Sequence, residues 1–324
     1  MAFGFRDLHW RGRDGKGRST WRRGWVVAGL ALLTAALMAF HRQIPDSIGN
    51  FGSLLETFLP WVGLAVPVLL VPALLRRSAS AVVALLAPAL VWLLLFGPLL
   101  TDKSGGGYDF TAVQHNISAT NTDVGGTMDT LMKANPDVIS LEEITGAELP
   151  TIQQKLDGTY RYHLVEGTVG LWSKYPLTDT QPVDIKIGWT RALRATVNSP
   201  NGAVAVYVAH MPSVRVKFDG GFTANQRNRS AESLGQALTH APLKRVLLLG
   251  DMNGTMNDRA LAPITMQLRS AQGSAGSGFG FSWPSGSPLT RIDQIMSRGM
   301  TPTSAWTLPQ TGSDHLPIAA HFQL

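Results

Sequence analysis

The sequence predicts a mixed α/β sandwich preceded by three membrane-spanning helices, and two observations lead to this fold class. First, the apolar residues are unevenly distributed, because three long uncharged stretches all lie within residues 1–100. Second, the rest of the chain consists of short apolar runs separated by turn residues, several of which can pair as hairpins around a few helices. This pattern favours a sandwich over a doubly wound parallel sheet. A domain of about 220 residues is large enough for one extensive core.

The three apolar stretches cover about 24–40, 58–75 and 81–100. Each is about long enough to cross a hydrocarbon core of roughly 30 Å at about 1.5 Å per residue. The third stretch, AVVALLAPALVWLLLFGPLL, contains no charged residue. The alternative for the first stretch is a signal peptide, but no clean small-x-small cleavage site follows it and two further stretches lie downstream. We therefore expect a multi-pass protein of the cell membrane.

The positive charge of the chain is concentrated at its N-terminus. The formal net charge is +6, yet seven basic and two acidic residues precede Trp25, whereas 18 basic and 17 acidic residues lie between Lys103 and Leu324. Basic segments stay on the cytoplasmic side, so residues 1–23 are expected there as a tail. Arg76 and Arg77, between the second and third stretches, also suit the inside. Three crossings then place the domain after residue 103 outside the cytoplasm.

The same charge distribution bears on the type of partner. A protein that binds duplex nucleic acid through its phosphates usually presents a basic face on the binding domain. The nearly balanced charge after Lys103 gives no such indication, so no stable nucleic-acid partner is expected. The chain has no cysteine, which excludes disulfides, zinc–thiolate sites and thiol catalysis.

Residues 101–107 are a polar, glycine-rich linker, and the domain is expected to cover residues 108–324. Asn201-Gly202 is a strong hairpin signal, and Glu166-Gly167 marks a second turn. A glycine- and serine-rich stretch at 270–287 is expected to be a long loop near a binding site. The expected strands are 112–117, 137–141, 160–165, 169–172, 191–198, 203–210, 245–249, 292–296 and 318–322, and the expected helices are 126–134 and 225–239.

Polar side chains that can perform catalysis follow the ends of these strands. Carboxylate and amide oxygens without cysteine suit Mg²⁺ or Mn²⁺ rather than zinc. Histidines together with carboxylates can supply a general base, a group that orients it and a group that stabilises phosphate charge. Taken singly, each residue has a structural explanation as a turn or a cap; only the ordered set indicates a site. The set is Asn116, Glu143, His210, Asp251, Asn253, Asp293, Asp314 and His315.

This ordered set resembles the endonuclease/exonuclease/phosphatase superfamily, which has the DNase I-like fold. The resemblance covers about residues 108–324. It rests on NPDVISLEEI (135–144), LLLGDMN (247–253), RIDQI (291–295) and GSDHLPI (312–318), with support from QHNIS (114–118), GLWSKYPL (170–177) and YVAHMPS (207–213). The fold it implies is a four-layer sandwich of two mixed sheets flanked by helices.

The resemblance also implies a role for each residue in the hydrolysis of a phosphoester. His315 matches the general base, Asp293 the carboxylate that aligns it, and His210 the histidine at the scissile phosphate. Asp251 and Asn253 match the pair that orients the attacking water and binds phosphate. The metal-associated positions are Glu143, Asn116 and Asp314. Glu142 stands where the family usually has glutamine, and is interpreted as structural.

The fold alone does not determine the substrate. The chain also resembles VanJ-type membrane proteins associated with teicoplanin resistance, which implies dephosphorylation of undecaprenyl pyrophosphate at the outer face of the membrane. A DNase I-like nuclease outside the cytoplasm and a sphingomyelinase or phospholipase C-like phosphodiesterase remain as alternatives. Arginine suits bidentate phosphate contacts, so Arg191, Arg194 and Arg227 are candidates for binding a second phosphate, with Arg215, Lys217 and Arg229 as further basic residues nearby in the sequence.

Overall fold

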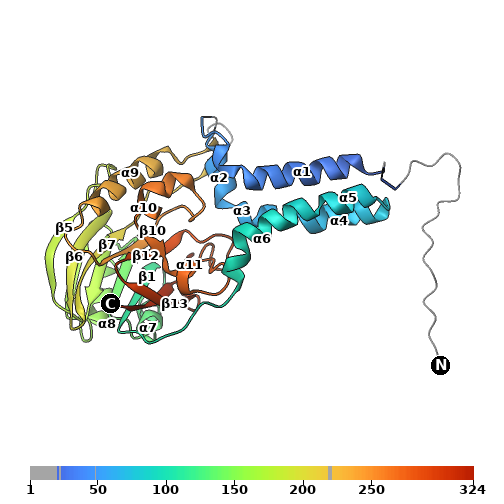
Figure 1. Ribbon diagram of the computed structural model, residues 1–324. Helices are drawn as coiled ribbons and strands as arrows, with labels where there is room; N and C mark the ends of the chain where they lie inside the picture. Colours follow the sequence, from blue (N-terminus) through green and yellow to red (C-terminus); the bar gives the residue numbers. More distant parts are fainter. Residues whose placement is uncertain (1–19, 22, 48, 218–220) are drawn as a thin grey trace, which may run out of the picture. The chain divides into compact units, whose positions relative to one another are not determined.

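The computed structural model describes residues 20, 21, 23–47, 49–217 and 221–324. The chain divides into two compact units, one made of Met1–Phe40 and Pro60–Leu95 and the other of His41–Leu59 and Phe96–Leu324 (Figure 1). The tail expected over residues 1–23 lies almost entirely outside the described residues.

The first unit is built from apolar helices. Helix α1 (Trp25–Ala39) packs against α4 (Ala65–Leu75) and α5 (Ala79–Ala84), and small side chains at Ala31, Ala73 and Ala81 let the backbones approach closely. Ser78 caps α5, because its hydroxyl accepts a hydrogen bond from the amide of Ala81. Helices α3 (Leu59–Val62) and α6 (Leu86–Leu100) complete the apolar segments.

One helix of the described residues, Ala79–Leu100, is long and apolar enough to cross a membrane by length and composition. A second would be counted if the bent pair Phe51–Thr57 and Leu59–Leu75 formed a single span. Trp25–Ala39, expected to be the first span, is a shorter apolar helix of 15 residues. The prediction of three full-length spans is therefore not confirmed: the first apolar stretch makes a helix too short for this criterion, and Leu59–Leu75 meets it only together with Phe51–Thr57, from which it is bent by 79°.

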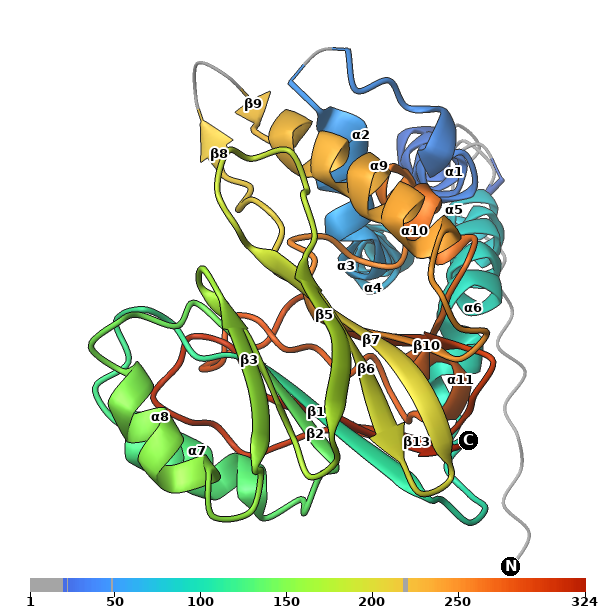
Figure 2. The same cartoon turned by 90° about the vertical axis from the view of Figure 1, so that its left-hand side faces the viewer.

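The second unit contains two mixed six-stranded β-sheets flanked by helices (Figure 2). The first sheet has the order β13-β14-β1-β2-β4-β3, formed by Thr301–Thr307, Ile318–Gln323, Phe110–Asn116, Val138–Glu142, Val169–Ser173 and Tyr162–Glu166. The second has the order β11-β12-β10-β7-β6-β5, formed by Arg269–Ser270, Asp293–Arg298, Val246–Asp251, Gly202–Ala209, Ala192–Ser199 and Leu177–Pro182.

Three apolar layers hold this sandwich together. Phe110, Leu171, Val206 and Leu247 belong to the buried cluster to which both sheets contribute. Helices α7 (Val124–Met132) and α8 (Leu149–Leu156) cover the outer face of the first sheet. Helices α9 (Asn225–Thr239) and α10 (Ala262–Thr265) cover the second. The expected four-layer α/β sandwich of two mixed sheets and flanking helices is the observed architecture.

The expected strands and hairpins form with boundaries shifted by a few residues, and α9 covers the expected range 225–239. Strands β5 and β13 and helix α8 were not expected. The sequence of β5, LTDTQP, is polar because five of its six residues are exposed at a sheet edge, so it lacks an apolar alternation. The expected loop 270–287 begins with a short helix, α11 (Ala271–Ala275), which Ser270 caps.

The segment His41–Leu59 folds with the second unit, although the sequence places it between two apolar stretches. It contains a 3₁₀ turn, η1 (His41–Gln43), and helix α2 (Phe51–Thr57). Near it lies a two-stranded ribbon of β8 (Val216–Lys217) and β9 (Gly221–Phe222), whose Phe222 amide donates to the carbonyl of Gly49. The buried carboxylate of Glu56 faces the His41 ring at 3.2 Å, so α2 has a polar side that a lipid environment would not solvate.

Candidate active site

The topology of the two sheets brings the predicted polar residues to one place. Strands β1 and β2 are parallel neighbours, so Asn116 and Glu143 lie at the same edge of the first sheet. In the second sheet, Asp251 at the end of β10 is directly opposite Asp293 at the start of β12. Strand β7 runs parallel to β10, and His210 follows its last residue. Gly250 permits this close pairing, because a Cβ there would lie 1.9 Å from the Ala209 carbonyl oxygen.

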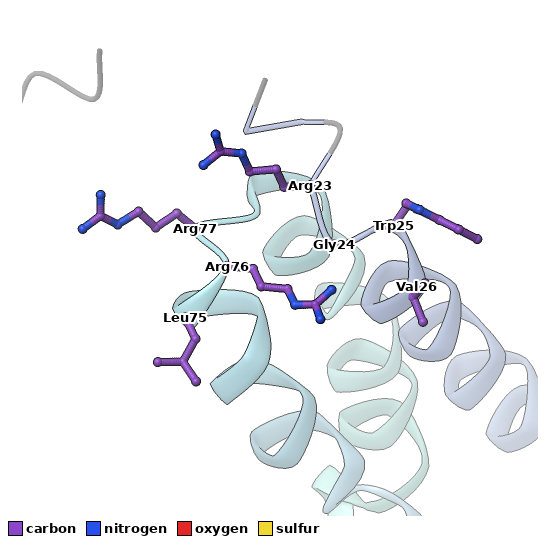
Figure 3. Close-up of a pocket in the computed structure, with 7 residues that line it drawn as sticks. All are labelled: Arg23, Gly24, Trp25, Val26, Leu75, Arg76 and Arg77. Atoms are coloured by element: carbon purple, nitrogen blue, oxygen red, sulfur yellow. The ribbon is translucent and has the colours of Figure 1, made fainter. Parts of the chain in front are cut away.

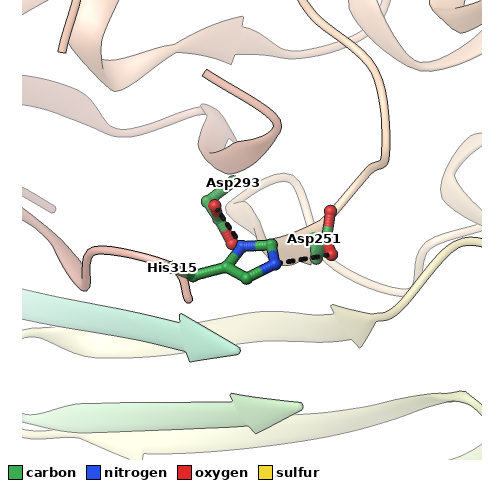
Figure 4. Close-up of side chains that lie close together, drawn as sticks. All are labelled: Asp251, Asp293 and His315. Atoms are coloured by element: carbon green, nitrogen blue, oxygen red, sulfur yellow. Dashed lines mark hydrogen bonds and ion pairs between the residues drawn. The ribbon is translucent and has the colours of Figure 1, made fainter. Parts of the chain in front are cut away.

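His315 and Asp293 form the centre of a buried hydrogen-bonded network (Figure 4). The Nδ1 atom of His315 lies 2.8 Å from Oδ2 of Asp293. Two further groups donate to the same carboxylate, the Ser282 hydroxyl at 2.6 Å and the Gln114 amide at 3.1 Å. With its Nδ1 atom held by Asp293, His315 turns Nε2 towards Asp251, whose Oδ2 atom is 3.9 Å away.

Burial and charge determine the protonation of this network. Burial alone would lower the pKa of His315, but the charge of Asp293 and its hydrogen bond outweigh burial and raise that pKa to about 10. Burial raises the pKa of Asp251 to about 7, although the charge of His315 opposes the shift. Burial also acts to raise the pKa of Asp293, but the charge of His315 and the donated hydrogen bonds hold that pKa below its ordinary value. Without a bound cation, His315 is therefore an imidazolium at neutral pH.

A second group of polar side chains surrounds Asn116. Its Nδ2 atom lies 3.2 Å from Oε1 of Glu143 and 3.2 Å from Oδ2 of Asp251. The Nε2 atom of His210 lies 3.7 Å and 3.6 Å from the same two carboxylates. Burial, with the nearby charge of Arg191, places the pKa of His210 well below its ordinary value, so this ring is neutral. Glu143 has a left-handed backbone with a φ of 63°, a conformation that non-glycine residues adopt rarely.

The arrangement fits a divalent cation of the hard type. The carboxylates of Glu143 and Asp251 approach a single amide from two sides, and such oxygen donors are the ligands that Mg²⁺ and Mn²⁺ prefer. Asp251, Asp293 and His315 also offer ligand atoms within 4.8 Å of one another. A cation among those three would compete with the hydrogen bond between Asp293 and His315, so we favour the side of Glu143. The carboxylate of Asp314 is exposed and accepts a hydrogen bond from the Trp283 indole at 3.3 Å.

These groups open into a pocket of about 570 Å³. Its charged and polar lining consists of Glu143, His210, Ser213, Arg215, Asp251, Asn253, Asp314 and His315. Its remaining lining is uncharged and largely apolar, from Thr57, Phe58, Val214, Phe222, Trp283, Thr290 and Ile292. One pocket is thus lined by both charged and apolar side chains.

The three candidate arginines have different surroundings. The Arg191 guanidinium contacts the ring of His210 and lies 5.1 Å from the ring centre of Trp189; it does not line the pocket itself and adjoins the site only through His210. Arg194 faces Gln181 on the neighbouring strand and does not line the pocket. Arg227 is fully buried 2.5 Å from Asp258, and therefore stabilises the fold instead of binding substrate phosphate as expected from the sequence. Arg215, by contrast, lines the pocket.

A second pocket, of about 480 Å³, lies in the helical unit (Figure 3). Its lining residues are Arg23, Gly24, Trp25, Val26, Leu75, Arg76 and Arg77. These side chains include neither a carboxylate nor an imidazole, so this pocket lacks a general base and cannot perform the chemistry that the sequence predicts.

Several residues of the site were not expected from the sequence. Gln114 and Ser282 donate to Asp293, and Phe58 and Trp283 line the pocket. Ser282 and Trp283 lie in the glycine- and serine-rich stretch 270–287, which was expected to lie near a binding site. The composition of this stretch therefore indicated the region of the site, although not these two residues. The sequence did not indicate that Phe58 lines the site, because this residue begins an apolar stretch that predicts a membrane span.

Comparison with known proteins agrees with this geometry. The endonuclease/exonuclease/phosphatase family matches residues 113–315, which is more than half of the chain, so the chain belongs to this family. Among curated proteins, none matches the chain significantly.

Solved structures share the fold at low sequence identity. The endonuclease/exonuclease/phosphatase from Bacteroides vulgatus has a TM-score of 0.57 and 15% identity, covering 67% of this chain and 100% of its own. The mannosyl-6-phosphatase of Bacteroides thetaiotaomicron has a TM-score of 0.54 and 12% identity, with coverages of 67% and 100%. TDP2 of D. rerio, complexed with a single-stranded DNA product, has a TM-score of 0.55 and 17% identity, with coverages of 66% and 99%.

Proposed function

We propose that this member of the endonuclease/exonuclease/phosphatase family is a membrane-anchored, Mg²⁺-dependent phosphoesterase that hydrolyses a lipid-linked pyrophosphate. Undecaprenyl pyrophosphate at the outer face of the cell membrane is the proposed substrate, which would connect the enzyme with recycling of the cell-wall lipid carrier and with teicoplanin-type resistance. Family membership supports the hydrolysis of a phosphoester, whereas the lipid substrate rests on the pocket and on the apolar helices.

The observation that carries the proposal is the mixed lining of the 570 Å³ pocket. His315, Asp251 and Glu143 can act on a phosphate group. Phe58, Phe222, Val214 and Ile292 line the same pocket and offer contacts to an apolar chain. An amphiphile with phosphate at one end matches both kinds of lining residue.

The chain's own residues account for the reaction. A water molecule attacks the terminal phosphorus as the bond to the bridging oxygen breaks, and Nε2 of neutral His315 accepts the proton of that water. Asp293 holds Nδ1 of His315, which fixes the ring and stabilises the imidazolium that forms. Asp251 and Asn253 orient the water and the phosphate, and His210 with Arg191 faces the developing negative charge. The products are inorganic phosphate and the lipid monophosphate.

A divalent cation would be held by the carboxylates of Glu143 and Asp251, next to Asn116, with Asp314 at the pocket rim. When bound, it would neutralise phosphate charge and lower the pKa of His315, which favours the neutral base.

The helical unit supports a membrane location. Ala79–Leu100 is long and apolar enough to cross a bilayer, and many leucines of the other helices are exposed. The basic tail and Arg76-Arg77 are the basis for proposing a cytoplasmic N-terminus and an outward-facing catalytic domain. A reporter phosphatase fused after Leu324 should then be active outside the cell, and activity restricted to the cytoplasm would reverse this orientation.

Purified protein tests the proposed reaction directly. Incubation with undecaprenyl pyrophosphate, plasmid DNA and sphingomyelin, each with Mg²⁺ or with EDTA, should release phosphate only from the first and only with Mg²⁺. Nicking of plasmid DNA without phosphate release would support the nuclease alternative. Cleavage of sphingomyelin alone would support the phospholipase C-like alternative.

A further inference from the structure

The segment His41–Leu59 follows the first apolar helix, yet two of its residues reach the active-site pocket. Thr57 and Phe58 line that pocket together with Glu143, His210 and His315. The two residues come from the last turn of α2 and the residue after it. The family match begins at residue 113, so this segment lies outside the part of the chain that the family shares.

Buried polar contacts fix the segment to the loop that follows the catalytic strand β10. The Ser53 hydroxyl donates to Asp258 at 2.7 Å and accepts from Arg227 at 2.8 Å, and all three side chains are fully buried. The Thr255 hydroxyl donates to the carbonyl of Glu56 at 3.2 Å. Because separating these groups would leave buried polar atoms without partners, the position of α2 is strongly determined.

Arg259 anchors the other end of the segment. Its guanidinium lies 2.9 Å from the Asp46 carboxylate and donates to the carbonyls of Arg42 and Ile44. Its backbone amide donates to the Glu56 carboxylate at 2.9 Å. The anchor residues Thr255, Asp258 and Arg259 directly follow Asp251 and Asn253 in the chain, so one loop positions both the catalytic carboxylate and the segment.

We propose that the segment His41–Leu59 is a specificity element, in which Phe58 forms the wall that binds the first part of the hydrocarbon chain of an amphiphilic phosphoester. The inference rests on the proposed function and names the part of the site that recognises the lipid. Phe58, Phe222, Val214 and Ile292 are apolar residues that line the same pocket as the catalytic groups. Phe58 directly precedes the apolar helix α3 in the chain.

Two pyrophosphates that share a reactive group but differ in chain length test this assignment. Undecaprenyl pyrophosphate carries a long chain, and dimethylallyl pyrophosphate carries a single isoprene unit. In full-length protein in nanodiscs, Phe58→Ala should reduce the ratio of kcat/KM for the long substrate over the short one by about tenfold, because it removes most of one aromatic contact. Phe58→Leu, which retains an apolar side chain, should restore most of the ratio.

Phe51→Ala is the matched control, since Phe51 lies on the same helix, is exposed and does not line the pocket. Its ratio should equal that of the wild type. An equal loss on both substrates in Phe58→Ala would show a merely structural role, and an unchanged ratio would show that the wall does not bind the chain. Either result overturns the proposal.

A binding measurement separates this inference from the proposed reaction. Calorimetric titration with dodecyl phosphate and with inorganic phosphate does not depend on turnover. Phe58→Ala should weaken dodecyl phosphate binding about tenfold relative to phosphate binding. If the wild type hydrolyses neither pyrophosphate but Phe58→Ala still weakens dodecyl phosphate binding selectively, the proposed reaction is wrong, whereas the role of Phe58 in binding the chain is supported. If both ligands weaken equally, the wall assignment fails.

Discussion

The two sides of the active-site pocket have different origins in the chain. The polar side consists of residues at the ends of β-strands, such as Asp251 and Asp293, whose positions follow from strand pairing. The apolar side is completed by Phe58, which arrives from a segment more than 50 residues before the first strand of the sandwich and is held by side-chain contacts. With the proposed role of Phe58, catalysis and specificity are built by separate parts of one chain.

The largest effect is expected when His315 or Asp293, the central residues of the catalytic network, is replaced. His315→Ala should lower kcat by about a thousandfold, the order expected when a general base is lost, while circular dichroism shows an unchanged fold. Asp293→Asn should also lower kcat strongly, because the amide cannot stabilise the imidazolium. Near-normal turnover of undecaprenyl pyrophosphate by His315→Ala would show that the base is a different residue.

The next effect tests how the apolar side is anchored. Asp258→Ala should destabilise the protein by about 3–5 kcal/mol, because it leaves the fully buried Arg227 without its partner. Asp129→Ala, which breaks the exposed ion pair with Lys155, should cost less than about 1 kcal/mol. Urea unfolding of both variants measures the difference, and equal losses would contradict the anchoring role of Asp258.

The pH dependence of stability sharpens the description of the polar side. The folded pKa of His315, about 10, exceeds its ordinary value of 6.5. The charged His315 ring therefore stabilises the folded protein fully below pH 6.5, and this stabilisation is lost as the pH rises through 10. In EDTA, wild-type protein should therefore be more stable than His315→Gln by an amount on the order of a few kcal/mol at pH 6.5, and by much less at pH 10. Urea unfolding at a series of pH values measures this difference, and a pH-independent difference would contradict it.

The smallest effect concerns Glu142, which occupies a place where the family usually has glutamine. Burial, reinforced by the charges of Asp293 and Asp251, raises the pKa of Glu142 well above its ordinary value, so the side chain is neutral in the folded protein. It accepts a hydrogen bond from Gln114 at 2.7 Å, and glutamine can do the same. Because the folded pKa of Glu142 is raised, the wild-type protein loses stability as the pH rises above the unfolded pKa, and glutamine, which does not ionise, avoids this loss. Glu142→Gln should therefore stabilise the protein by about 1 kcal/mol, more at pH 8 than at pH 4. Activity should be preserved. Thermal unfolding at the two pH values checks this; a loss of stability at pH 8 would show that Glu142 is ionised.

The residues at strand ends could be predicted from the sequence, whereas the residues placed by long-range contacts could not. Strand ends such as those before Glu143, His210 and Asp251 were predictable, because apolar runs and turn residues mark them locally. Arg227 could not be assigned from the sequence, since only the fold reveals that Asp258 and Ser53 enclose its guanidinium. Phe58 was equally inaccessible, because an apolar residue beside an apolar helix gives no sign that it turns into a pocket. Local patterns thus indicate secondary structure, whereas long-range side-chain contacts decide which residues meet.

The pairing of β1 with β14 has a consequence for how the protein is made. These strands are the first and the last of the sandwich, and they lie side by side within one sheet, with Phe110 opposite Phe322. The amide of the final residue, Leu324, also donates to Asp109 at 2.9 Å. The sheet that carries Asn116 therefore cannot be completed until β14 has emerged from the ribosome. Nascent chains should stay sensitive to proteases until then, and deletion of Ile318–Gln323 should remove an inner strand of the sheet.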